Sequence, residues 1–143
     1  MKKINSSVRF CLDLTKFQTE LARRLDSRLG GLGLNEFVIL YALGQAEGQK
    51  MRRVDLAEKV GLTASGVTRL LLPMEKIGLV KREINENDAR SSLVVLASGG
   101  KTKLNEGIER AEIFCEDIVP RERIKKLEEF SKLLIELGRN IKF

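Results

Sequence analysis

Apolar side chains recur at helical spacing over the first 29 residues. Steps of three and four residues separate Phe10, Leu14, Phe17, Leu21, Leu25 and Leu29. Such spacing places the six side chains on one helix face, and a stripe this broad needs a large apolar surface to cover it. Gly30, Gly31 and Gly33 follow and favour a helix end, because glycine tolerates a positive φ. We therefore expect one long helix over residues 4–29.

Shorter helical patterns follow. A helix is expected over about residues 36–46, with Asn35 as its N-cap, and another over residues 54–60, ended by Gly61. A longer helix is expected from about Ala64 to Ile77, with a kink at Pro73. The apolar residues of this last helix that we expect in the core are Leu70, Leu71, Met74 and Ile77.

Beyond Gly78 the pattern becomes that of a β-hairpin. Residues 79–84 and 93–96 are predicted strands, and residues 85–88 form a polar turn. The helical period returns at about Gly100, and Pro120 suits the first turn of a further helix. That helix carries a coiled-coil seam at steps of three and four residues, formed by Leu127, Phe130, Leu134, Leu137 and Ile141.

Composition excludes several classes of protein. The 143 residues suffice for one domain, and the formal net charge of +6 suits a polyanionic partner. Residues 49–91 hold nine basic and six acidic residues, a net +3. Because the chain has no histidine, histidine-based catalytic sites and metal sites are excluded. No apolar run is long enough to span a membrane and no signal peptide is evident, so we expect a cytoplasmic protein. We also expect that the protein is not an enzyme and that it binds no cofactor or metal.

The order of helix, short helix, turn, longer helix and hairpin is the plan of a winged helix-turn-helix. The turn is marked by Leu56-Ala57, three further residues, and Gly61-Leu62. Ala57 is small enough for the two helices to approach each other, and Gly61 lets the backbone reverse direction. Leu62 is expected to fill the small core between these helices.

The run LAEKVGLTASGVTRLLLPMEKIGLVKREINENDARSSLVVLASGGK resembles the MarR family of regulators. The matching positions are Val67-Thr68-Arg69, Glu75, Gly78-Leu79-Val80, Arg82, Asp88-x-Arg90 and Gly100. The resemblance implies a mainly α fold with a small β-hairpin wing. It also implies dimerisation helices at residues 1–29 and 98–143, around a DNA-binding domain at residues 30–97. Within that domain we expect the recognition helix at about residues 63–77 and the wing at about residues 79–97.

The residue types in these two elements suit DNA. Short polar side chains at the start of a helix can approach bases and phosphates in the major groove, and arginine can reach guanine or a phosphate. The candidates in the recognition helix are Thr63, Ala64, Ser65, Gly66, Thr68 and Arg69. Those in the wing are Lys81, Arg82, Asn87, Asp88, Arg90 and Ser91, with Arg52 and Arg53 as further phosphate contacts.

Residue type alone leaves more than one role open for several of these side chains. Arg90 is expected in the minor groove, and Asp88 is expected to orient Arg90 or a neighbouring arginine through a carboxylate–guanidinium pair. Simpler interpretations are that Thr63 only caps its helix, that Arg69 covers the helix surface, and that Asp88 and Arg90 form a solvated pair.

The functional hypothesis is a homodimer, formed through residues 4–29 and 101–143, that binds a pseudo-palindrome in double-stranded DNA and represses transcription. The resemblance also implies release by a small-molecule effector. The alternative is a thiol-based regulator that senses oxidants through Cys11, near which peroxide-sensing relatives place a reactive cysteine. A third hypothesis is a scaffold whose winged domain binds only protein.

Overall fold

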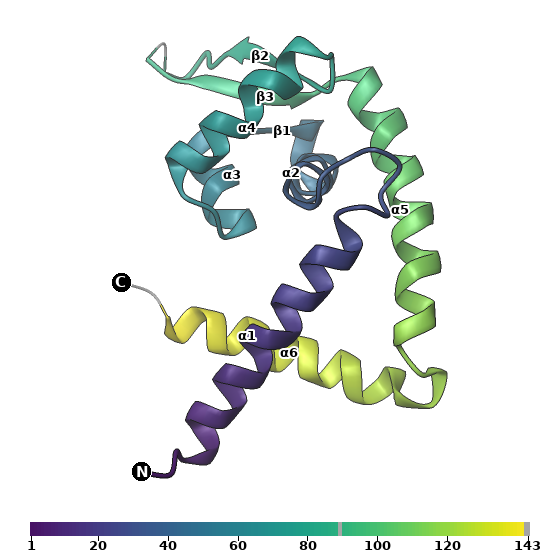
Figure 1. Ribbon diagram of the computed structural model, residues 1–143. Helices are drawn as coiled ribbons and strands as arrows, with labels where there is room; N and C mark the ends of the chain where they lie inside the picture. Colours follow the sequence, from purple (N-terminus) through teal and green to yellow (C-terminus); the bar gives the residue numbers. More distant parts are fainter. Residues whose placement is uncertain (89, 142–143) are drawn as a thin grey trace. The chain divides into compact units, whose positions relative to one another are not determined.

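The computed structural model describes residues 1–88 and 90–141 (Figure 1). Two parts of the sequence prediction therefore reach outside the described residues. These are positions 142 and 143 of the predicted C-terminal segment and the middle position of the Asp88-x-Arg90 motif. The chain forms two compact units, Met1–Ala111 and Glu112–Phe143, which we describe separately.

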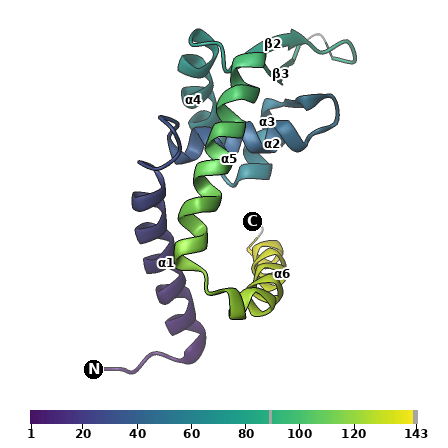
Figure 2. The same cartoon turned by 90° about the vertical axis from the view of Figure 1, so that its right-hand side faces the viewer.

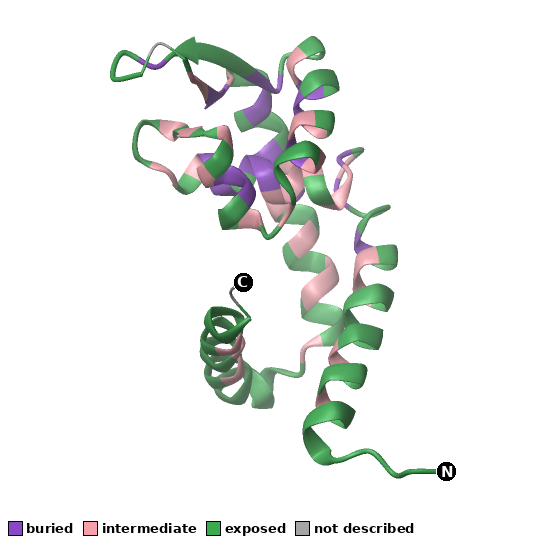
Figure 3. Cartoon of the chain, turned by 90° about the vertical axis from the view of Figure 1, so that its left-hand side faces the viewer, coloured by how far each residue is buried: buried purple, intermediate pink, exposed green. Residues whose placement is uncertain are grey.

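Helix α1, Ser6–Leu25, opens the first unit. The Asn5 side chain caps it by accepting a hydrogen bond from the Val8 N–H at 2.9 Å. The helix ends four residues before the predicted end, and Leu29 lies buried in the turn that follows. Val8, Leu12 and Phe17 are exposed, whereas Leu25 is buried. Phe10, Leu14 and Leu21 are half-buried. The predicted apolar stripe is therefore fully covered only at the C-terminal end of the helix, and most of α1 appears as exposed in Figure 3.

Helix α2, Leu34–Gln45, begins earlier than predicted. Its N-cap is Gly33, and the expectation that Asn35 caps the helix is wrong. The Gly33 N–H donates to Glu36 Oε1 at 2.8 Å, and the Leu34 N–H donates to Asp26 Oδ1 at 2.6 Å. Two carboxylates thus satisfy backbone donors at the helix start, which leaves no need for an asparagine cap.

The helix-turn-helix consists of α3, Arg53–Val60, and α4, Ala64–Lys76. Leu56, Val67 and Met74 are fully buried between the helices and the sheet. Pro73 lies within α4, and the kink predicted there stays a prediction. Ile77 is not a core residue as expected, because it follows the last helical residue and its side chain is 68% exposed.

The sheet has three strands in the order β1-β3-β2, one more than predicted. The expected hairpin is formed by β2, Val80–Ile84, and β3, Ser92–Leu96. Strand β1, Lys50–Arg52, follows the short 3-10 helix η1, Glu47–Gln49, and pairs antiparallel with β3. Strand β3 is therefore central in the sheet, with β2 on one side and β1 on the other. Figure 2 shows the hairpin extending away from the helices.

Helix α5, Ser98–Ile118, starts against this sheet. A Cβ atom at Gly100 would collide with the Leu79 carbonyl oxygen, so only glycine permits this close approach. One turn further, Leu104 is buried, and Gly107 faces the ring of Phe37 from α2. Lys103 Nζ donates to the Gly30 carbonyl oxygen at 3.3 Å. The first half of α5 is therefore part of the same core as the winged helix.

The second unit holds the end of α5, the 3-10 helix η2, Arg121–Arg123, and helix α6, Ile124–Asn140. Helix α6 buries none of its residues. The predicted seam is present as a helix face, but Phe130, Leu134 and Leu137 are only half-buried, and Leu127 and Ile141 are exposed.

Candidate nucleic-acid interface

The turn between α3 and α4 has the predicted glycine and small residue, but Leu62, which was expected to fill the small core, is only half-buried. Gly61 adopts φ 71°, in the left-handed region, and the Leu62 N–H donates to the Ala57 carbonyl oxygen at 3.1 Å. Ala57 is buried, as its small size predicts for a close helix crossing. This turn fixes the start of α4 relative to α3.

Thr63 is the N-cap of α4. Its Oγ1 accepts a hydrogen bond from the Gly66 N–H at 3.0 Å and lies 3.3 Å from Ser65 Oγ. A Cβ atom at Gly66 would lie 2.9 Å from Thr63 Oγ1, so glycine leaves room for the cap. The capping interpretation of Thr63 thus has a direct hydrogen bond, while Thr63, Ala64 and Ser65 stay exposed at the helix start.

Thr68 and Arg53 face each other rather than open solvent. Thr68 Oγ1 donates to the Ala64 carbonyl oxygen at 3.0 Å and accepts from Arg53 Nη1 at 3.4 Å. Both side chains are half-buried, and Arg53 Nε is buried without a hydrogen-bond partner among the described residues. Arg53 therefore connects the start of α3 to the recognition helix, and it has an unused donor beside that helix.

The outer face of α4 consists of Ser65, Arg69, Leu72 and Lys76. These residues are spaced by four, three and four positions and lie opposite the buried Val67, Leu71 and Met74. All four are exposed. Neither Arg69 nor Lys76 has an ion-pair partner among the described residues. This face therefore offers two free cations around one apolar side chain.

The two basic residues at the base of the wing lie on opposite faces of β2. Arg82 Nε donates to Glu75 Oε2 of α4 at 3.2 Å, so this arginine already has an anionic partner. Lys81 is paired in register with Val95 on the other face, where Lys50 of β1 is also paired with Val95. Lys81 and Arg82 therefore stay separate candidates for phosphates, on opposite faces of β2.

Two further ion pairs hold the cations of β1. Lys50 Nζ lies 2.9 Å from Glu83 Oε1, and this hydrogen bond raises the pKa of Lys50. Arg52 binds Asp55 with two hydrogen bonds, from Nε to Oδ2 at 2.8 Å and from Nη2 to Oδ1 at 3.1 Å. The same bonds raise the pKa of Arg52 and lower the pKa of Asp55. Arg52, which precedes α3, is thus bound to Asp55 in the first turn of that helix.

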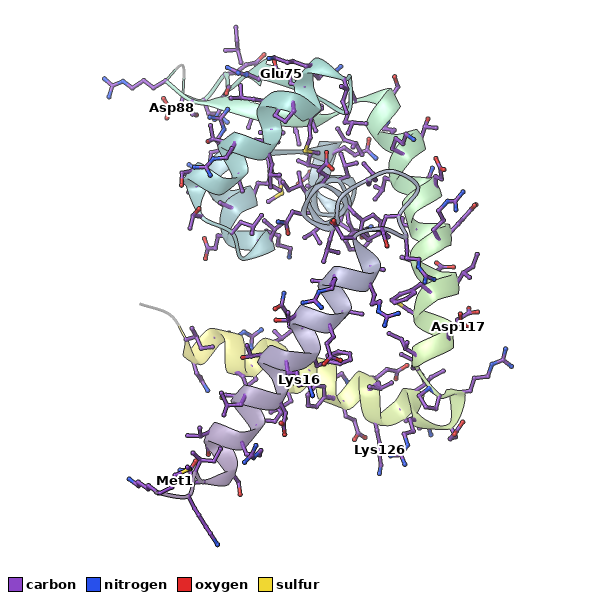
Figure 4. The ribbon with its side chains drawn as sticks, viewed as in Figure 1. Met1, Lys16, Glu75, Asp88, Asp117 and Lys126 are labelled. Carbon is purple, nitrogen blue, oxygen red and sulfur yellow. The ribbon has the colours of Figure 1, made fainter. Side chains whose placement is uncertain are left out.

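The wing tip is organised by its own side chains. Asn85 is buried, donates from Nδ2 to Ser91 Oγ at 3.1 Å, and accepts from the Asn87 N–H at 3.1 Å. Asp88 Oδ1 accepts from the Arg90 N–H at 3.0 Å, and no ion pair to Asp88 occurs in the described part of the chain. The carboxylate therefore shapes the backbone before Arg90. After the larger contributions of Asp55, the charge of Asp88 also raises the pKa of Arg52, and the expectation that Asp88 orients Arg90 or a neighbouring arginine stays a prediction. Figure 4 places Asp88 at the tip of the hairpin, with Glu75 near β2.

The exposed start of α4, its outer face and the exposed Arg90 all lie in the first unit. The sequence interpretation missed Lys76 and Leu72. It named Glu75 only as a position that matches the family, and Asn85 only as part of the polar turn. Lys76 could have been found by extending the Ser65–Arg69 stripe by seven residues, since the helical period continues through Pro73. Asn85 lies at the start of the predicted polar turn, and its side chain hydrogen-bonds within that turn.

Other candidate chemistry is sparse. Cys11 is exposed on α1, and Cys115 is half-buried, which raises the pKa of its thiol. Over residues 1–88 and 90–141 no three metal-ligating side chains of the His, Cys, Asp or Glu types gather in one place. Over the same residues no helix has the length and apolar character needed to cross a membrane.

Comparison with known proteins supports this geometry. The model of the MarR family matches residues 32–92, which include the helix-turn-helix and most of the wing. The uncharacterised HTH-type transcriptional regulator YfiV of Bacillus subtilis is 47% identical over 47 residues, which are 33% of this chain and 29% of YfiV. The match thus spans well under half the length of that relative.

Solved structures match over nearly the whole chain. The transcriptional regulator BldR of Sulfolobus solfataricus superimposes with a TM-score of 0.78 and 25% identity, covering 95% of this chain and 99% of BldR. The MarR-family regulator Sco3205 of Streptomyces coelicolor, solved in complex with DNA, gives a TM-score of 0.77 at 21% identity, covering 95% of this chain and 91% of that one. This chain is therefore similar to the MarR family over residues 32–92, which are less than half of its length, and it has the winged-helix fold of these solved structures.

Proposed function

We propose that this protein is a sequence-specific DNA-binding transcription regulator that acts as a homodimer. The observation that carries the proposal is the exposed face of α4, where Arg69 and Lys76 lack ion-pair partners among the described residues and hydroxyl side chains surround the helix start. An α-helix fits the major groove, and unpaired cations on its outer face suit phosphates and guanine.

The wing supplies a second point of contact. Arg90 is exposed at a tip whose backbone is held by Asn85 and Asp88. An arginine presented by a preformed loop fits the narrow minor groove of A·T-rich DNA, where the negative potential is strongest. Recognition helix and wing together would bind neighbouring grooves of one half-site.

The terminal helices support a dimer. Helix α6 buries no residue, and apolar side chains of α1 such as Leu12 and Phe17 are exposed. Apolar faces of this size on two helices favour burial against a second copy. Two recognition helices would then enter successive major grooves about one helical turn, ~34 Å, apart, on a pseudo-palindrome. We further propose that such binding represses transcription by covering a promoter.

Selection of bound DNA from a random pool, followed by salt titration, tests the proposal. We expect an enriched inverted repeat and a steep fall of log K with log salt. Arg90→Ala and Arg69→Ala should each make the slope shallower, by about 0.9 for every phosphate that the arginine neutralises in the wild-type complex. Lys126→Ala on α6 is the matched control and should leave the slope unchanged. Weak binding that ignores both arginines would instead favour the protein scaffold.

The thiol-switch alternative rests on Cys11, which is exposed as oxidation requires. We do not adopt it, because the described residues contain no ion pair or hydrogen bond to its sulfur that would activate it. Replacing Cys11 by Ser and measuring DNA binding with and without peroxide decides between the two. A peroxide response that disappears in Cys11→Ser would establish the switch.

A further inference from the structure

Leu72 lies in the centre of the outer face of α4 and is not part of the hydrophobic core. Its side chain is 49% exposed, although the same helix buries Val67, Leu71 and Met74. Arg69 lies one turn before it and Lys76 one turn after it on the same face. The neighbouring Pro73 is also exposed and widens the apolar surface.

The chemistry of this face is unusual for a solvated helix surface. Exposed single leucines need no special explanation, but this one lies between two cations without ion-pair partners in the described part of the chain. A partner that is anionic on both sides and apolar between them would match this surface. The major groove has that pattern, because phosphates border the groove and the C5-methyl of thymine is the apolar group on the base edges.

We propose that Leu72 reads thymine by packing against C5-methyl groups in the major groove, which makes it a specificity-determining residue. The inference rests on the proposed DNA-binding function and extends it to the sequence that is bound. Leucine has no donor or acceptor, so against cytosine or adenine it would cover an amino group without bonding it. Arg69 and Lys76 would anchor the helix on either side, so the preferred thymine lies between their contacts.

The experiment removes the methyl group alone. In the half-site enriched by selection, each thymine is replaced in turn by deoxyuridine, and Kd is measured for wild type and for Leu72→Ala. With wild type, we expect one or two positions at which uridine weakens binding about fourfold, the value of burying one methyl-sized group. With Leu72→Ala, these positions should become insensitive to uridine.

Ile77→Ala is the matched control. Ile77 is also an exposed apolar residue at the end of α4, but it lies about a third of a turn away from the outer face. This variant should keep the full uridine effect. Leu72→Met, which retains an apolar side chain of similar size, should keep most of it, and this shows that loss in Leu72→Ala is not a folding defect.

The possible failures are separable. An enriched, salt-dependent half-site whose uridine effects are the same in wild type and Leu72→Ala would overturn the thymine inference and leave the proposed function intact. Absence of any enriched sequence, together with binding that is indifferent to salt, would overturn the proposed function, and the thymine inference with it.

Discussion

The basic residues of the candidate interface differ in whether they have a hydrogen-bond or ion-pair partner within the chain. Arg52 is held by two hydrogen bonds to Asp55, and Lys50 by Glu83. Arg53 is half-buried against Thr68, whereas Arg90 is exposed at the wing tip. Residues with partners within the chain support the shape of the interface, and exposed unpaired ones are available for DNA. Substitutions should therefore separate into effects on stability and effects on affinity.

The Arg52–Asp55 pair makes stability depend on pH at the acid end. The pair lowers the pKa of Asp55 from its ordinary value of 3.8, so its contribution is present above that value and is lost as pH falls through the lower folded pKa. Wild type should accordingly be more stable than Asp55→Asn near neutral pH. The difference in urea midpoint should disappear in strong acid. Glu58→Gln, at an exposed position in the same helix, should show little pH-dependent difference.

Gly61 provides a test of backbone conformation without side-chain packing. It adopts φ 71°, and an added Cβ would meet no atom within 4 Å. Gly61→Ala should therefore destabilise the fold by about 1–2 kcal/mol through the left-handed conformation alone. Gly61→Asn should cost less, because asparagine tolerates this region. Equal losses in chemical denaturation for both variants would contradict this account.

At the level of elements, α4 is attached at both ends. Its start is capped by Thr63, and its end is linked to the wing through Glu75 and Arg82. Both links are exposed, so each adds little to stability, about 0–1 kcal/mol for the ion pair. The link does set which charge the wing presents: while Glu75 holds Arg82, the arginine is only partly available to DNA.

Glu75→Gln should strengthen non-specific DNA binding. The change removes a negative charge and releases Arg82 for a phosphate, so the salt slope should become steeper by about 0.9 for each released arginine. The double variant Glu75→Gln/Arg82→Ala should return to a slope near that of wild type. Salt titration on a fixed duplex measures both, and a slope unaffected by Glu75→Gln would show that Arg82 does not reach DNA.

Much of this architecture follows from local sequence signals. The helix-turn-helix was predictable because its signals are close together in the sequence. Gly61 marks the turn, and the periodic core residues Leu56, Val67 and Met74 lie within a few helical turns of it. The hairpin was predictable from its polar turn between apolar strands. Strand β1 was missed because Lys50, Met51 and Arg52 have no strand pattern and become a strand only by pairing with β3, about forty residues later.

Site details depend on hydrogen bonds that are distant or shared. Asp88 was expected to orient Arg90 or a neighbouring arginine, and the hydrogen bond that the structure shows is one from the Arg90 N–H, which shapes the turn. Asn35 was expected to cap α2, but Glu36 and Asp26 supply the carboxylates that bind the first backbone donors. Residue type alone does not show which of several possible hydrogen bonds forms.

For the whole molecule, burial is uneven. The winged helix and the first half of α5 contain most of the buried leucines and valines, and Leu25 and Leu29 add to them at the end of α1, while α6 has none (Figure 3). A helix whose apolar seam is only half-buried gains little from tertiary packing within its own chain. Stability of the terminal helices should therefore depend on a second copy.

The dimer proposal predicts that stability depends on protein concentration. For a dimer that unfolds to separate chains, each tenfold rise in concentration should add about 1.4 kcal/mol of apparent stability and raise the thermal midpoint. Scans over a hundredfold concentration range measure this. Leu134→Glu in the α6 seam should abolish the dependence and give monomers by sedimentation, whereas Lys132→Glu, at an exposed position in the same helix, should not. Concentration-independent midpoints for wild type would contradict the dimer.

The uneven burial along α1 also has a consequence for the order of folding and assembly. Leu25 and Leu29 secure the end of this helix to the winged domain, while Val8, Leu12 and Phe17 before it are exposed. A newly made single chain can fold its DNA-reading part and yet leave the first turns of α1 open to exchange and to proteases until assembly. Unassembled copies are thus the ones a cell can recognise and remove, and amide hydrogen exchange along α1 would report the fraction that has found a partner.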